Sequence, residues 1–118
     1  MFSIVTAYED YKVSDSDFSN GFAKDLAPGD KFTVSIDGGS YSIQVLSVYQ
    51  NLVDVSASKN EKKFFAINDD YHPEERKYEV TEDNYYDILV TLDNINWVSP
   101  QNNSARITIK KIHEEIPK

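Results

Sequence analysis

Acidic and amide side chains gather at three places in this sequence, and hard cations such as calcium are bound by loops that supply several oxygen ligands. The first place pairs Asp15 with Asp17, and the second is Asn68-Asp69-Asp70. The third place is Glu82-Asp83-Asn84 with Asp87. It has the best spacing of the three, although it lacks the glycine and the Asp-x-Asp-x-Asp run of a strong calcium loop. A solvated acidic turn is the alternative interpretation. The predicted metal ligands, with calcium as the one cofactor considered, are Glu82, Asp83 and Asp87.

Residues for catalysis are sparse. A hydrolase of the serine or cysteine type needs a nucleophile beside a base that a third group orients. The only histidines are His72, in an acidic loop, and His113, near the C-terminus, and there is no cysteine. Two histidines alone make at most a partial zinc site, and no two of the twenty acids stand out as a glycosidase pair. We therefore expect no catalytic residues and no enzymatic activity.

Aromatic side chains offer a second kind of chemistry, because exposed rings on a β-sheet protein can stack on sugars. Tyr8 and Tyr11 are candidates near the N-terminus. Most tyrosines in such a domain pack their ring and leave only the hydroxyl at the surface, which is the alternative. The residues predicted to bind a ligand are Trp97, Tyr71 and Tyr85.

The elements that must position these residues are predicted from alternation. In 31–37 every even residue is apolar and every odd residue polar, which is typical of a strand with one buried face. Gly38-Gly39 then predicts a tight hairpin turn into Tyr41–Val45. The apolar parity changes after Val45, which indicates a bulge or a strand buried on both faces. Further strands are predicted at 52–57, 62–67, 78–80, 85–94 and 104–112, with Trp97 in the loop between the last two.

The N-terminal region is less regular. Residues 2–7 are strand-like, and 14–26 carries Phe18, Phe22 and Leu26 at helical spacing but has Gly21 inside it, so a short helix, a loop or a strand all remain open there. About 7–8 strands with regular turns predict an all-β fold, an antiparallel, immunoglobulin-like β-sandwich, rather than a small barrel. The length of 118 residues predicts one domain, 1–118.

The net charge of the chain and the composition of its segments limit the kinds of partner and the compartment that we expect. The formal charge of −8 argues against nucleic acid and against an anionic membrane surface. No apolar run reaches membrane-spanning length, and no signal peptide follows Met1. Strand-like segments close to both ends favour an excised ectodomain over a cytoplasmic protein. Asn102-Asn103-Ser104 is a glycosylation sequon that matters only in an exported chain, and it makes Asn102 a candidate modification site.

Two stretches carry a resemblance to a known class of proteins. Residues 28–38 with 41–45 resemble the opening of small β-sandwich modules of archaeal and bacterial cell-surface and S-layer-associated proteins. Residues 83–92, with their Tyr-Tyr-Asp, and 105–112 resemble the closing half of those modules. Where those modules have Asp-Gly in the turn, this chain has Glu82-Asp83-Asn84. The resemblance implies an extracellular spacer or adhesion module.

Several functions are compatible with these observations. The leading expectation is a non-enzymatic module of the cell surface or of a secreted protein, with a structural or adhesive role toward a protein or surface-layer partner. The alternatives are an acidic intracellular inhibitor, for example phage-encoded, that imitates nucleic acid, and a carbohydrate-binding module. An upstream signal or membrane helix in the gene would argue against the inhibitor, whereas a free-standing gene of this length would argue against the ectodomain.

Overall fold

The computed structural model describes residues 8–57, 61–66, 74–81 and 83–117, and these form nine strands and one short helix. That helix has six residues, well below the length at which a helix crosses a bilayer. The elements, in chain order, are β1 (Asp10–Lys12), α1 (Asp15–Asn20), β2 (Phe22–Leu26), β3 (Lys31–Ile36), β4 (Gly39–Val48), β5 (Leu52–Ala57), β6 (Glu61–Ala66), β7 (Glu74–Tyr78), β8 (Tyr85–Ser99) and β9 (Asn102–Glu115).

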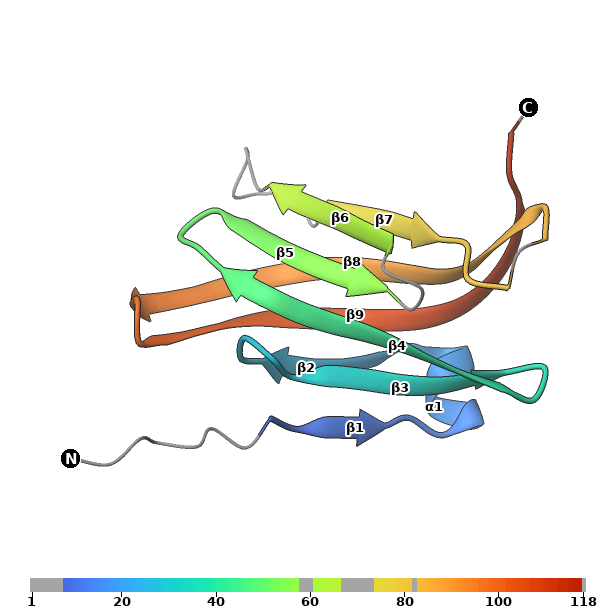
Figure 1. The fold of residues 1–118 in the computed structure, drawn as a ribbon, viewed down its shortest axis with the longest axis horizontal. Coiled ribbons are helices and arrows are strands. Elements are labelled where there is room, and N and C mark those ends of the chain that lie inside the picture. Colours follow the sequence, from blue (N-terminus) through green and yellow to red (C-terminus); the bar gives the residue numbers. More distant parts are fainter. Residues whose placement is uncertain (1–7, 58–60, 67–73, 82, 118) are drawn as a thin grey trace.

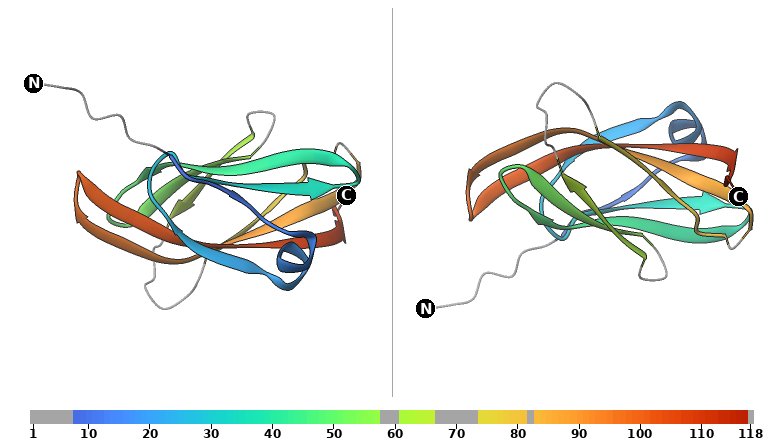
Figure 2. Two further views of the ribbon diagram at one scale, coloured as in Figure 1. Left: turned by 90° about the horizontal axis from the view of Figure 1, so that it is seen from below. Right: turned by 90° about the horizontal axis from the view of Figure 1, so that it is seen from above.

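The strands lie in two sheets that face each other (Figures 1 and 2). One sheet has the order β1-β3-β4-β5-β6 and the other the order β2-β9-β8-β7. Within each sheet, strands that follow each other in sequence are joined as meanders, and the single parallel pair among the described strands is β1 with β3. This two-layer arrangement confirms the predicted all-β sandwich, and of the alternatives left open for 14–26 a short helix is present as α1, followed by β2.

Alternating residues of both sheets fill the space between them. Phe32, Val34 and Ile36 are buried on β3, as the alternation predicted, while the residues between them are more exposed. Removing this much apolar surface from water is the main source of stability for a chain of this size. The other fully buried side chains of the core include Ile43, Val45, Val53, Val55, Ile88, Val90, Leu92, Ile107 and Ile109.

The β3–β4 hairpin was predicted correctly except for its turn, which lies one residue earlier. Ile36 pairs with Gly39, so the turn residues are Asp37 and Gly38 rather than Gly38-Gly39. Both have positive φ, 50° and 84°, as a two-residue turn that follows the sheet twist requires. Gly39 serves another purpose, since a Cβ there would come within 2.8 Å of the Tyr41 hydroxyl.

β-Bulges shift the pairing register of the longer strands. The register between β4 and β5 shifts between Val45 and Ser47, which confirms the predicted bulge, and Leu46 is turned to solvent. The β8–β9 pair contains three such shifts and extends further than predicted, to Ser99 and Asn102. Trp97 therefore lies inside β8, and its predicted place in a loop was wrong. Polar asparagines on one face of 94–97 hid the strand, since they are poor strand formers.

The N-terminal region combines three short elements. Ser14 caps α1 by accepting a hydrogen bond from the Asp17 backbone N–H at 3.1 Å, and the helix buries Phe18. It ends at Gly21, which has φ 99°. The chain then enters β2, which pairs with β9, so the predicted helical spacing holds only in its first part. The strand predicted over residues 2–7 lies outside the described residues.

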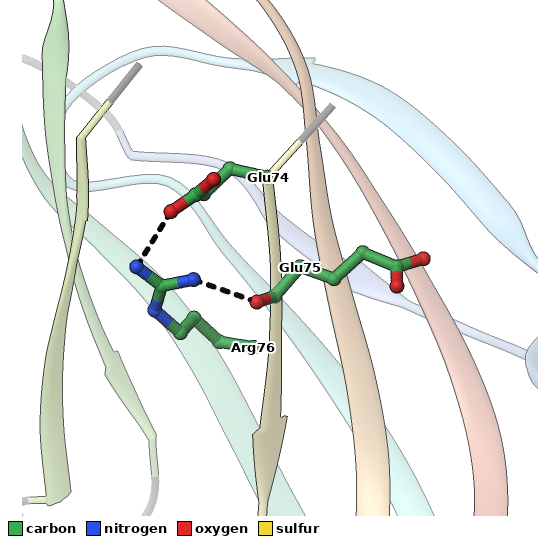
Figure 3. Close-up of polar contacts among 3 residues, drawn as sticks. All are labelled: Glu74, Glu75 and Arg76. Carbon is green, nitrogen blue, oxygen red and sulfur yellow. Dashed lines mark hydrogen bonds and ion pairs between the residues drawn. The ribbon is translucent and has the colours of Figure 1, made fainter. Parts of the chain in front are cut away.

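Charged residues protect the edge strand β7 (Figure 3). The Arg76 guanidinium contacts the Glu74 carboxylate at 2.7 Å and donates to the Glu75 carbonyl at 2.8 Å. Arg76 pairs with Val90, whose side chain is buried, so the Arg76 side chain lies on the core-facing side of its sheet. Lys77 donates to Glu114 on β9 at 2.6 Å, and that hydrogen bond raises the pKa of the lysine.

Candidate functional site

Asp87 is the most enclosed carboxylate of the predicted site. It lies at the bulge at the start of β8 and is only 5% exposed. Its Oδ2 accepts hydrogen bonds from the backbone N–H of Val80 at 2.8 Å and of Thr81 at 3.1 Å. The Thr81 hydroxyl donates to both carboxylate oxygens. The Asp87 side chain therefore holds the connection between β7 and β8 in place.

Two more carboxylates lie beside it. Among the described residues, the one group of three or more potential metal ligands is Glu79, Asp83 and Asp87, whose ligand atoms lie within 4.8 Å of one another. Glu79 accepts from the Asp83 N–H at 2.9 Å, and Asp83 accepts from the Tyr85 N–H at 2.9 Å. The structure thus brings together two of the predicted ligands, while Glu82 lies outside the described residues. Glu79 was missed because the loop geometry, and not the sequence spacing, returns it to Asp83.

The other predicted acidic clusters differ from this one. Asp15 and Asp17 are exposed in the first turn of α1, where negative charge favours the helix N-terminus. Asn68-Asp69-Asp70 lies outside the described residues. The connection between β7 and β8 is therefore the place where calcium binding remains a prediction, since three carboxylates supply part of the six to eight oxygens that calcium takes.

Calcium binding at Glu79, Asp83 and Asp87 predicts a measurable stabilisation, because a ligand that binds only the native state raises the free energy of unfolding. For a dissociation constant of about 1 mM, 10 mM calcium adds roughly 1.4 kcal/mol. Thermal unfolding with and without calcium measures this, and the Glu79→Gln/Asp83→Asn variant should lose the response. A melting temperature that does not change with calcium contradicts the predicted site.

A hollow of about 310 Å³ lies next to these carboxylates, and residues of both sheets line it. Asp37 lines it from the β3–β4 turn, and Lys111 and His113 line it from β9. Its lining combines the carboxylates of Asp37, Asp83 and Asp87 with the Lys111 ammonium and the His113 imidazole. A lining of this kind can recognise charged groups.

The aromatic residues predicted to bind a ligand do not form one surface. Tyr85 begins β8, where the exposed His113 ring stacks on it at 3.9 Å with an interplanar angle of 13°. Trp97 lies twelve residues further along the same strand, roughly 40 Å away at the strand rise, and packs partly buried against the core. Tyr71 lies outside the described residues. The structure therefore separates Trp97 from Tyr85.

The two N-terminal tyrosines also differ. Tyr11, on β1, packs on Phe32 with ring centroids 6.2 Å apart, and Lys24 places its Nζ 5.2 Å from the tyrosine ring. Burial, followed by the charges of Asp30 and Glu9, raises the pKa of Tyr11. Tyr8 is 64% exposed, with its ring over Gly29. Tyr11 is thus part of the packing, and Tyr8 belongs to the surface.

The predicted glycosylation site lies at the tip of the β8–β9 hairpin. Asn102 is the first residue of β9 and is exposed. Its neighbour Asn103 fixes the tip by donating its side-chain amide to the carbonyls of Ser99, at 3.0 Å, and Pro100, at 3.2 Å. The side chain of Asn102 is accessible to an enzyme that reads the sequon.

A second candidate surface was not predicted. The large hydrophobic residues that are exposed in the described part of the chain are Tyr8, Leu46, Tyr49 and Val98. Tyr49 lies in the β4–β5 turn, Leu46 and Val98 lie near the last residues of β4 and β8, and Tyr8 precedes β1. The ends of β4 and β8 lie away from α1 (Figure 1). We call this surface the uncharged end and define it by its own residues, Tyr8 with 27–29, 46–52 and 94–105. Charged residues border it, because Glu9 is exposed beside Tyr8 and β7 begins at Glu74, which pairs with Leu92. The available signal was the absence of Asp, Glu, Lys and Arg from 38–53 and 94–105 in a chain that is 27% charged.

Comparisons with protein-family models, curated protein sequences and solved structures gave no match, so any function proposed for this chain depends on its own geometry.

Proposed function

We propose that this chain is a non-enzymatic β-sandwich module of a cell-surface or secreted protein, with a structural and adhesive role toward a protein or surface-layer partner. One observation carries the proposal. β1 begins at one end of the sandwich and β9 finishes at the other, and both strands run along its long axis (Figure 1). Tension applied through the two ends of the described chain is therefore directed along the strands.

Tension in this direction loads the strand ladders in shear. The hydrogen bonds between paired strands are perpendicular to the strands or slanted across them, so sliding one strand past another strains many bonds together. Pulling sideways at a hairpin instead opens the bonds one after another. A spacer that must resist extension gains from the first geometry, which supports the structural half of the proposal.

The two terminal strands differ in how firmly they are held. β9 pairs with β2 on one side, from Phe22 to Leu26, and with β8 on the other side over most of its length. β1 pairs with β3 at three positions, extended by hydrogen bonds from Val13 to Thr33 and from Lys31 to Glu9. We expect β1 to detach first under load and the β9 ladders to resist longest.

Single-molecule pulling tests the proposal. The chain contains no cysteine, so introduced cysteines can serve as unique handles. Pulling between the chain ends is expected to need a higher force than pulling between Ser40→Cys and Glu115→Cys, which are exposed, lie on different sheets and sit at the same end of the sandwich. Equal forces in both directions would argue against a load-bearing role.

A specific observation also favours the alternative of an acidic intracellular binder. Exposed acids gather at the end of the sandwich that carries α1, among them Asp37, Asp83 and Glu114. A partner with a basic cleft would bind there, and its affinity would fall steeply with salt. Titration with a polylysine peptide, repeated with Asp37→Asn/Asp83→Asn, tests this candidate, and binding that does not depend on these residues or on salt excludes it.

A further inference from the structure

The hollow beside the carboxylates is formed by three segments that are distant in sequence. The β3–β4 turn, the start of β8 and the last part of β9 meet at the end of the sandwich that carries α1 (Figure 1). The hollow among them has a volume of about 310 Å³. This volume is at the lower end of the range of roughly 300–1,000 Å³ that is usual for pockets that bind small molecules. The hollow therefore has room for a small molecule.

Carboxylates supply the hydrogen-bond acceptors of the hollow. Asp37 and Asp83 are exposed, whereas Asp87 is 5% exposed. Among the described residues, the Asp87 Oδ1 accepts only from the Thr81 hydroxyl, which has one hydrogen to share between both carboxylate oxygens. This buried carboxylate can therefore accept a further hydrogen bond. A ligand ammonium, with its positive charge and three donors, matches such acceptors.

Basic side chains supply the donors. Lys111 pairs with Ile88, whose side chain is buried, so Lys111 lies on the core-facing side of its sheet. His113 stacks on Tyr85 at 3.9 Å, which fixes the position of the imidazole. Within the part of the chain that the structure describes, neither basic group forms an ion pair with the acids of the hollow. The Lys111 ammonium and the His113 ring N–H are therefore available to a ligand carboxylate.

The remaining lining is aliphatic and comes from Ile36 and Ile112. The hollow thus combines acceptors for an ammonium, donors for a carboxylate and a small apolar surface. An α-amino acid with an aliphatic side chain carries the three complementary groups on one carbon atom. Its two charges cancel, so it avoids the repulsion that the formal charge of −8 exerts on a simple anion. It also avoids placing an unpaired positive charge beside Lys111.

We propose that this hollow binds a small zwitterion, an aliphatic α-amino acid, whose ammonium contacts the three aspartates and whose carboxylate contacts Lys111 and His113. The site goes beyond the structural and adhesive role proposed above. A bound ligand would connect the β3–β4 turn of one sheet with β9 of the other, and it would therefore stabilise this end of the sandwich.

Isothermal titration calorimetry of the full chain with L-leucine tests the proposal, in buffer from which calcium has been removed. We expect a dissociation constant of about 1 mM or lower, since the ligand is small and makes a few charge-assisted hydrogen bonds. L-Leucinamide, which lacks the carboxylate, and N-acetyl-L-leucine, which lacks the ammonium, should each bind at least roughly ten-fold more weakly. At equal concentration, L-leucine should raise the melting temperature more than either analogue.

Two variants test the two kinds of contact. Lys111→Met removes the ammonium that would pair with the ligand carboxylate. Asp37→Asn removes a negative charge and keeps a residue type that tolerates the positive φ of this turn position. Each should weaken L-leucine binding by at least roughly five-fold. The matched controls are Lys110→Met and Asp25→Asn, which make the same charge changes at exposed positions outside the hollow and should bind L-leucine like the native chain.

A second measurement locates the ligand. In the isotope-labelled chain, L-leucine should shift the backbone amide resonances of 36–37, 83–87 and 111–113 and leave those of the β8–β9 tip unchanged. The proposal is overturned if about 50 mM L-leucine gives neither heat nor shifts, if L-leucinamide binds as tightly as L-leucine, or if Lys111→Met and Lys110→Met bind equally well. None of these results depends on mechanical strength, so the ligand site and the load-bearing role can fail separately.

Discussion

Replacement of Asp87 by alanine is expected to lower the free energy of unfolding by about 3 kcal/mol. The substitution removes the acceptor for the N–H groups of Val80 and Thr81, and Val80 is itself 2% exposed. A buried donor that loses its partner costs its full desolvation penalty, and the Thr81 hydroxyl loses its acceptor as well. Urea unfolding followed by circular dichroism measures the change.

Two variants distinguish the hydrogen-bonding role of Asp87 from the effect of the negative charge that Glu79, Asp83 and Asp87 share. Asp83→Ala removes a neighbouring carboxylate that is exposed, and we expect a loss below about 1 kcal/mol because water can replace it. Asp87→Asn keeps one oxygen acceptor and should fall between the two. If Asp83→Ala and Asp87→Ala were equally destabilising, the role assigned to the buried hydrogen bonds would be wrong.

Replacement of Asp30 by alanine is expected to cost about 2–3 kcal/mol. Asp30 is 8% exposed, and its two carboxylate oxygens accept from the backbone N–H of Glu9 at 3.0 Å and of Ala27 at 2.9 Å. These bonds tie the start of β1 to the turn between β2 and β3. Chemical unfolding measures the loss, and pulling between the chain ends should release β1 at a lower force.

The control for Asp30 is Asp10→Ala. Asp10 lies on β1 and accepts a hydrogen bond from the Thr33 hydroxyl at 2.6 Å, but it is exposed. Its removal should cost less than about 1 kcal/mol, because both groups can turn to water. If β1 detached from the Asp30→Ala variant at the same force as from the native chain, the Asp30 carboxylate would not be the anchor of this strand.

The central hairpin was predictable because its signals are local. Alternation over 31–37 marks the buried face of β3, and the change of parity after Val45 marks the bulge. The turn was misplaced by one residue because Gly38 and Gly39 both tolerate positive φ, and only the strand pairing shows that Asp37 adopts it too.

The ends of the sandwich were less predictable because they depend on contacts between distant residues. β1 is a three-residue strand that exists through parallel pairing with β3, across about twenty residues of sequence. Trp97 continues β8 because Asn103 and its neighbours on β9 pair with it. Propensity alone cannot reveal pairings of this kind.

The candidate sites also contain one part that local sequence predicts and another part that depends on contacts between distant residues. Asp83 and Asp87 could be predicted to lie together because they are only four positions apart around the start of β8. Glu79 joins them only through the path of the loop between β7 and β8. The uncharged end is composed of Tyr8 and three stretches that are far apart in sequence, and only the fold shows that the β4–β5 and β8–β9 turns lie at the same end of the sandwich.

Direction dependence of mechanical strength is the most direct test of a module built to carry load along its strands. For one folded molecule, the ratio of the rupture force between the chain ends to that between residues 40 and 115 should be roughly two or more, because only the first direction shears the β9 ladders. A ratio near one, or a lower force between the chain ends, would contradict the account.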